Sequence, residues 1–122
     1  MAIFWLKNAP AALKMLARCP TLGIVSGLHE LFPDNDLILQ SLYGFGDAIE
    51  PGGYLIYTGQ PWHPQLEMIA RCLSSHREGQ DWVMRRRSQQ EMDQLVEKAG
   101  FEKVHQWIDD DGIFTVSLAV KK

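Results

Sequence analysis

The chain has 122 residues, of which 46% are hydrophobic and 22% are charged, and it carries a formal net charge of −3. A chain of this length and composition is expected to fold as one soluble domain over residues 1–122. The negative net charge argues against a nucleic-acid binder, because affinity for phosphate comes from clustered Lys and Arg.

The start of the chain, Met-Ala-Ile-Phe-Trp-Leu, is apolar but short. A signal peptide needs a basic start and a longer apolar region, and a transmembrane helix needs about 20 apolar residues. The sequence therefore predicts a cytoplasmic protein without a membrane span. Cys19 and Cys72 have neither the pattern of a disulfide framework nor a metal-type spacing, so we expect two reduced, buried thiols and no metal site.

The first predicted elements are a short helix over about residues 8–18 and an apolar strand over Thr21–Leu28. The strand segment, Thr-Leu-Gly-Ile-Val-Ser-Gly-Leu, shows no polar alternation, which is typical of a strand covered on both faces, as in a parallel sheet. Pro33-Asp34-Asn35-Asp36 then predicts a helix start, since acidic side chains favour the first turn. An apolar stripe follows at spacings of three and four: Ile38, Leu42, Phe45 and Ile49.

After the turn Glu50-Pro51-Gly52-Gly53, Tyr54–Thr58 reads as a second buried strand. A helix over about residues 65–73 is expected to face inward through Leu66, Ile69, Ala70 and Leu73. Residues 74–80 are expected to form a polar loop, and residues 82–84 a short extended piece.

Ser88-Gln89-Gln90-Glu91 matches a capping box, in which the serine and the glutamate satisfy each other's backbone donors. A helical stripe of Met92, Leu95, Val96 and Ala99 follows, and Gly100 is the expected stop. Phe101–Ile108 and Gly112–Val120 read as two strands joined by an acidic turn. The alternation of strands and helices predicts a parallel α/β sheet, to which the closing hairpin adds one antiparallel strand.

Several stretches carry a family resemblance. Ala99-Gly100-Phe101 at the end of the last helix and Ile-Glu-Pro-Gly-Gly-Tyr-Leu over residues 49–55 resemble the C-terminal half of class I methyltransferases, which use S-adenosylmethionine. Ile-Val-Ser-Gly-Leu-His-Glu-Leu-Phe-Pro-Asp-Asn over 24–35 and Tyr-Thr-Gly-Gln-Pro-Trp-His-Pro-Gln over 57–65 are similar to a bacterial group of methyltransferases. Some members of that group are joined to lysophospholipase-like hydrolases.

The resemblance implies a partial Rossmann-like methyltransferase fold, with a mixed sheet of about four strands flanked by helices. Thr21–Leu28 would be the family's fourth strand, Tyr54–Thr58 the fifth, Phe101–Ile108 the sixth and Gly112–Val120 the seventh. Their order would be 4-5-7-6, with the last strand antiparallel. The family's first strand and its glycine-rich turn are not found in this sequence. Gly44-Phe45-Gly46 does not replace that turn, because it lies inside a helical stripe and follows no strand.

In the complete fold the fourth strand has the first strand as its neighbour. Here it is expected to become an apolar edge, which invites association. Three arrangements could cover it: a homodimer, the N-terminal segment (Ala2–Lys7, within residues 1–11) folding over the edge, or a partner chain that carries the missing N-terminal methyltransferase half. We favour the homodimer.

The resemblance places the methyl acceptor after the fourth strand. By position these residues are Ser26, Gly27, His29 and Glu30, at the carboxyl end of a parallel strand, where α/β sheets bind ligands. His29 or Glu30 would act as the general base for transfer to oxygen or nitrogen. The alternative is that both side chains only hydrogen-bond the turn before Pro33.

Three residues follow the fifth strand at the same edge of the sheet: Gln60, Trp62 and His63. They could form a rim that binds the substrate, or they could equally form a hydrophobic corner that packs under a loop. Arg86, within Arg85-Arg86-Arg87, could clamp a phosphate or carboxylate, including a lipid-like substrate. Adjacent arginines on an extended segment alternate in direction, so at most two share a site. A solvated basic stretch is the favoured interpretation. His76 and His105 read as surface or packing residues.

Two functional hypotheses remain open. The first is a methyltransferase that acts on a small-molecule or lipid-like substrate, with the cofactor-binding half supplied from elsewhere. The second is a non-catalytic module, derived from a methyltransferase, that dimerises or binds a partner through the exposed strand. S-adenosylmethionine is implied by the resemblance alone, and this chain by itself is not expected to hold it.

Overall fold

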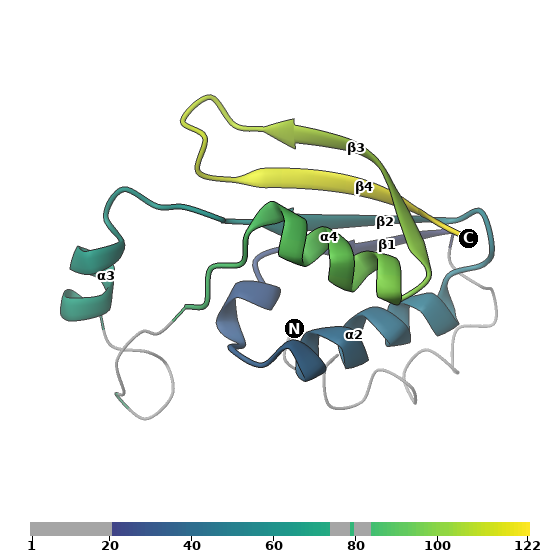
Figure 1. Cartoon of the computed structure of the whole chain (residues 1–122), viewed down its shortest axis with the longest axis horizontal. Helices are drawn as coiled ribbons and strands as arrows, with labels where there is room; N and C mark the ends of the chain where they lie inside the picture. Colours follow the sequence, from purple (N-terminus) through teal and green to yellow (C-terminus); the bar gives the residue numbers. More distant parts are fainter. Residues whose placement is uncertain (1–20, 74–78, 80–83) are drawn as a thin grey trace.

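The computed structural model describes residues 21–73, 79 and 84–122. These residues form an open four-stranded sheet with two helices packed beneath one face (Figure 1). The predicted helix over residues 8–18, the N-terminal segment 1–11, Cys19 and His76 lie outside the described residues. So do most of the predicted loop 74–80 and of the extended piece 82–84.

The strands are β1 (Leu22–Val25), β2 (Tyr54–Gly59), β3 (Phe101–Ile108) and β4 (Thr115–Lys121), in the order β1-β2-β4-β3. β1 pairs with β2 in parallel, whereas β4 lies between β2 and β3 and is antiparallel to both. The predicted order and the antiparallel last strand are thus confirmed.

Two predicted strands are shorter than expected. β1 ends at Val25 because Gly27, with a φ of 64°, turns the chain into the single 3-10 turn η1 (His29–Leu31). β4 begins only at Thr115, because the preceding residues close the turn. The backbone N–H of Phe114 donates to Asp109 Oδ1 at 2.8 Å, and that of Gly112 to the Asp109 carbonyl at 2.9 Å.

Helix α2 (Asn35–Ala48) begins where the sequence predicts. The Asp34 carboxylate accepts a hydrogen bond of 2.9 Å from the Asp36 N–H, so it caps the helix start. The inward stripe of α2 includes the fully buried Ile38 and Leu42. At Gly23 an added Cβ would lie 2.7 Å from Ile49, so this glycine lets β1 approach the helix closely.

Helix α4 (Gln89–Lys98) also follows the predicted pattern. Its apolar stripe is buried against the sheet, and Gly100, with a φ of 89°, ends it. Half of the predicted capping box is present: Ser88 Oγ accepts from the Glu91 N–H at 3.1 Å. The other half is wrong, since the Glu91 carboxylate binds Asn35 and Arg85 instead.

The hydrophobic core lies between the sheet and these two helices. Its largest fully buried side chains include Tyr57, Phe101, Leu55 and Val96. The Tyr57 hydroxyl donates to Asp93 Oδ1 on α4 at 2.8 Å, and Lys103 on β3 pairs with the other oxygen of that carboxylate at 2.7 Å. This polar pairing fixes α4 on the strands.

The opposite face of the sheet is not covered by any described helix. The cross-strand register places on it Leu22 and Ile24 from β1, Tyr54 from β2 and Val116 from β4. Ile24 is 61% exposed. The expected burial of the first strand on both faces is therefore not met by the part of the chain that the structure describes.

Helix α3 (Leu66–Cys72) corrects another prediction. It has no buried residue, so Cys72, which was expected to be buried, is exposed. The helix stands apart from the sheet at the end of an extended segment (Figure 1). The expected inward face was wrong, because Pro61 and Pro64 lie in the extended segment that carries the chain beyond the sheet. None of the described helices is long and apolar enough to cross a membrane.

Candidate active site at the carboxyl ends of β1 and β2

A small pocket opens where the parallel strands β1 and β2 end. Its cavity is about 20 Å³, room for one water molecule or hydroxyl-sized group. The loop after β1 is tied to β2 by a hydrogen bond of 2.9 Å from the Gly27 N–H to Thr58 Oγ1. The lining residues come from both strand ends and from the start of α4: His29, Glu30, Thr58, Gly59, Gln60, Pro61, Arg85, Arg87, Ser88, Gln89 and Met92.

His29 lies in η1 and is almost completely buried. Its Nε2 lies 3.4 Å from Ser41 Oγ on α2, while its Nδ1 has no hydrogen-bond partner. Burial, helped by the nearby Arg87 charge, lowers the pKa of His29 to about 4. The imidazole is therefore neutral at pH 7, and it is a weak base.

Glu30 is the acidic group of the pocket and is only 7% exposed. Its Oε2 is buried without a hydrogen-bond partner. Burial raises the pKa of the Glu30 carboxyl, and a backbone hydrogen bond and the charges of Arg87 and Arg86 oppose the rise. A carboxylate with a raised pKa is a stronger base than one in water, which suits a group that must accept a proton.

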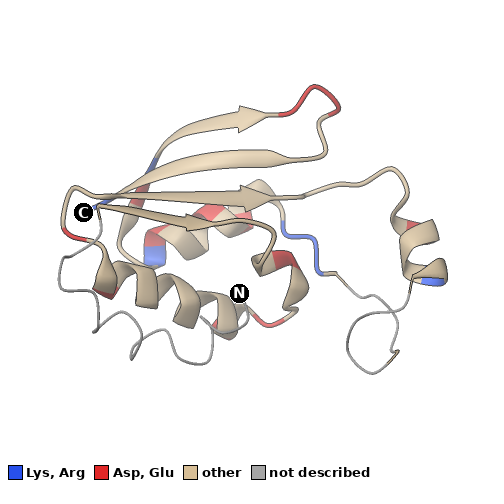
Figure 2. Ribbon diagram, turned by 180° about the vertical axis from the view of Figure 1, so that it is seen from behind, with Lys and Arg blue, Asp and Glu red and all other residues tan. Residues whose placement is uncertain are grey.

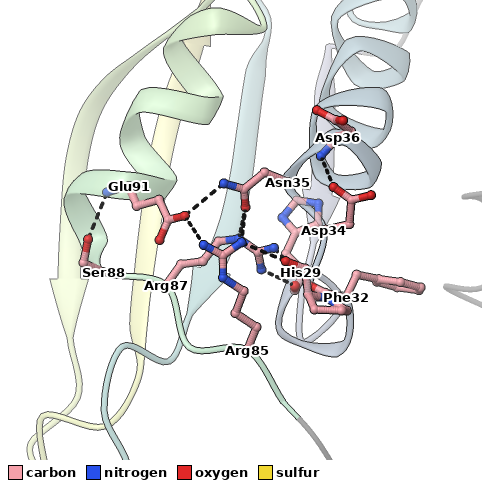
Figure 3. Close-up of polar contacts among 10 residues, drawn as sticks. His29, Phe32, Asp34, Asn35, Asp36, Arg85, Arg87, Ser88 and Glu91 are labelled. Carbon is pink, nitrogen blue, oxygen red and sulfur yellow. Dashed lines mark hydrogen bonds and ion pairs between the residues drawn. The ribbon is translucent and has the colours of Figure 1, made fainter.

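The arginine run holds the loop after β1 in place, as Figure 3 shows. Arg87 donates to Asn35 Oδ1 at 2.7 Å and to the backbone carbonyls of His29 and Phe32, each at 2.8 Å. Arg85 also reaches Asn35, at 2.8 Å, and pairs with Glu91 at 2.6 Å. Arg87 thus binds the segment that carries His29 and Glu30, and Arg85 binds the end of that segment by donating to the Pro33 carbonyl at 2.7 Å.

Arg86 points the other way, to Gln60 at the end of β2. It donates to the Gln60 side-chain oxygen and, at 3.3 Å, to its backbone carbonyl. The predicted alternation is confirmed, because Arg85 and Arg87 share Asn35 while Arg86 does not. The favoured interpretation of a solvated basic stretch is wrong: Arg87 is only 7% exposed, and all three arginines bind protein groups. In Figure 2 they form the basic segment that leads into α4.

The structure brings together only some of the residues predicted for the site. His29, Glu30 and Gln60 line the pocket, and Arg86 holds Gln60. Ser26 and Gly27 are exposed and do not line it. Trp62 and His63 lie farther along the segment towards α3, where Trp62 is exposed and His63 Nδ1 accepts from the Gln65 N–H at 3.0 Å.

Several contributors were not predicted. Arg87 and Asn35 fix the loop, and Ser88 and Gln89 bring the N-terminus of α4 to the pocket. The arginine run was the one available signal, but nothing in the sequence shows that Asn35 faces it across 52 positions. His105, predicted to be a surface or packing residue, packs edge-on against Trp107.

The described residues do not offer a nucleotide-binding turn. Gly44-Phe45-Gly46 lies inside α2, as expected, and a Cβ at Gly46 would lie 3.1 Å from the Ala99 carbonyl oxygen, so this glycine serves helix packing. In the same part of the chain no three His, Cys, Asp or Glu residues are grouped to hold a metal ion.

The sheet order and the two packed helices match the C-terminal half of the class I methyltransferase fold. The chain is similar to a methyltransferase from Methanosarcina mazei (TM-score 0.66, 16% identity), with 89% of this chain and 64% of that chain covered. It is also similar to human N-acetylserotonin methyltransferase in complex with S-adenosylmethionine (TM-score 0.64, 14% identity, 89% and 31% covered). At these identities the likeness shows the fold alone.

Sequence comparison identifies the family. Residues 7–121 match the family described as "Putative methyltransferase", and the chain belongs to it. The chain is 64% identical over 113 residues to the uncharacterized protein YnbC of Escherichia coli K12. That match covers 93% of this chain but 19% of YnbC, so the chain spans about a fifth of the length of this relative.

Proposed function

We propose that this chain forms the acceptor side of the active site of an S-adenosylmethionine-dependent methyltransferase. One observation carries the proposal: the buried Glu30 carboxylate leaves Oε2 without a partner in a pocket at the carboxyl ends of two parallel strands. That end of a parallel sheet is where α/β proteins bind ligands. We also propose a cytoplasmic location, on the sequence evidence alone.

In this proposal Glu30 is the general base and takes the proton of the acceptor. His29 is the weaker candidate, since burial and the nearby arginine charge hold its pKa at about 4. Gln60, held by Arg86, borders the acceptor, and Trp62, His63, Ser26 and Gly27 contribute the outer rim. The cofactor supplies an electrophilic methyl group when bound. Its adenosine would be held by groups outside the described residues or by a second chain.

The proposal is tested by titrating S-adenosylmethionine into the purified chain by calorimetry, with light scattering on the same sample. The labelled methyl group is then followed into small-molecule and lipid fractions of a bacterial extract. Because the proposal places the adenosine on groups outside the described residues or on a second copy of the chain, it predicts stoichiometric binding and transfer into one fraction, in contrast to the expectation from the sequence alone. Glu30→Gln should keep cofactor binding and lower transfer at least about 100-fold, the usual contribution of a general base. The matched variant Glu97→Gln, on the exposed side of α4, should behave as wild type.

A second candidate function is a non-catalytic module that associates through β1. It is favoured by the four-residue parallel edge strand with its exposed Leu22 and Ile24. Unpaired strand edges and apolar patches promote association. A stable dimer that does not bind S-adenosylmethionine would favour this module over the enzyme. Ile24→Lys should then convert the dimer to a monomer in light scattering, whereas Tyr43→Lys, on the exposed side of α2, should not.

A further inference from the structure

We propose that the pocket between β1, β2 and α4 binds a neutral molecule through a hydroxyl group, which donates its hydrogen to Glu30 and turns its lone pairs towards the start of α4. The inference rests on the proposed function and narrows it, because it makes the methyl acceptor a hydroxyl oxygen. It is drawn from the hydrogen-bonding capacity that the pocket leaves unused.

The pocket first requires a hydrogen-bond donor. Glu30 Oε2 is buried and has no partner, although the residue is only 7% exposed. A buried carboxylate oxygen without a partner is costly, so a ligand with an O–H or N–H group gains from meeting it. This requirement alone admits hydroxyls, amines and amides.

The start of α4, which also borders the pocket, requires lone pairs. Ser88 and Gln89 line it, and Ser88 Oγ caps only the N–H of Glu91. The N–H group of Gln89 comes earlier in the first turn, where a helix has no internal acceptor for it. Arg85 and Arg87 line the same pocket, where the Arg87 charge also acts on Glu30, so the pocket carries positive charge as well as the positive end of the helix dipole.

These two requirements together select the ligand class. An ammonium group can donate to Glu30, but it has no lone pair, and the arginines and the helix start repel it. A carboxylate or phosphate group suits these positive groups, but Glu30 repels it. A hydroxyl donates one hydrogen and keeps two lone pairs on the same atom, so it meets both requirements within one small cavity, whereas an amide carries its donor and its acceptor on different atoms.

The size of the cavity agrees with this choice. At about 20 Å³ the cavity suits a group the size of a hydroxyl, and the carbon frame that bears it needs the more open space around the cavity. The frame would lie outside, next to Pro61. When the O–H bond breaks, the proton passes to Glu30 Oε2 and the electron pair stays on the ligand oxygen. The developing negative charge then faces the arginines and the start of α4, which stabilise it.

Nuclear magnetic resonance on the whole chain tests the inference without S-adenosylmethionine. The reporter is the ¹³C-labelled methyl group of Met92, which is buried and lines the pocket, and the exposed Met68 on α3 is the internal reference. The probes are phenol and three analogues: anisole, which lacks the donor, benzylamine as an ammonium, and benzoate. We expect phenol to shift Met92 and not Met68, with at least tenfold tighter binding than any of the three.

Variants connect binding to the carboxylate. Glu30→Gln should weaken phenol binding at least tenfold, while Glu97→Gln should not change it. The inference is overturned if anisole binds as well as phenol, if benzylamine or benzoate binds better, or if no probe shifts Met92. Stoichiometric S-adenosylmethionine binding with methyl transfer to an amine would leave the proposed function standing and remove this inference. Phenol binding to a chain that does not bind S-adenosylmethionine would support the hydroxyl-binding pocket and argue against the proposed methyltransferase function.

Discussion

Replacing Arg87 tests whether the loop that carries His29 and Glu30 depends on a buried guanidinium. Arg87 makes three hydrogen bonds of 2.7–2.8 Å, to Asn35 and to the carbonyls of His29 and Phe32. Hydrogen bonds from charged donors contribute about 1.5–3 kcal/mol each. Methionine keeps part of the packed volume but removes all three donors, and water will reach some of the freed carbonyls. We therefore expect Arg87→Met to lower the free energy of unfolding by about 4 kcal/mol.

The measurement is urea unfolding followed by circular dichroism. With a slope of about 1.5 kcal/mol/M, a loss of 4 kcal/mol moves the unfolding midpoint by about 2.7 M. Arg71→Met is the matched control, because Arg71 pairs with Glu67 on α3 and its side chain is 76% exposed. That exposed pair should contribute only about 0.3 kcal/mol. Midpoints of the two variants within about 0.5 M of each other would refute the structural role assigned to Arg87.

Two further changes follow from the packing. Burial lowers the pKa of His29 from 6.5 to about 4. As the pH falls from 6.5 towards 4, the unfolded chain therefore binds a proton at this residue that the folded chain does not, and the folded state loses stability. Between pH 7 and 4.5 the wild type should lose about 2 kcal/mol more stability in urea titrations than His29→Gln does, and equal losses would contradict the burial argument. At Gly53 an added Cβ would lie 2.9 Å from the carbonyl oxygens of Glu50 and Thr21. Gly53→Ala should therefore strain the start of the β1–β2 pairing and lower the free energy of unfolding by about 2 kcal/mol. Calorimetric melting measures this loss, and an unchanged melting temperature would argue against the close approach of the two carbonyl oxygens to Gly53.

Local sequence patterns determined most of the elements. The capping residues Asp34 and Ser88 and the stop at Gly100 act within one or two turns of the chain, so their outcome is decided by neighbours in sequence. The strand order followed from the alternation of strands and helices together with the family resemblance. The carboxyl ends of β1 and β2 could be named in advance for the same reason, and His29, Glu30 and Gln60 do meet there.

Tertiary structure alone decided the rest. An apolar stripe predicts that one face of a helix packs against another element, but it does not predict whether such an element lies next to that face. Helix α3 buries no residue against the described part of the chain. In the sequence, three adjacent arginines predict a solvated basic stretch. The fold places Asn35 and the backbone carbonyls after β1 within hydrogen-bonding distance of Arg87. The side of each strand that is covered is likewise set by where α2 and α4 pack. These outcomes depend on groups far apart in the chain, because burial and hydrogen-bond partners are properties of the assembled fold.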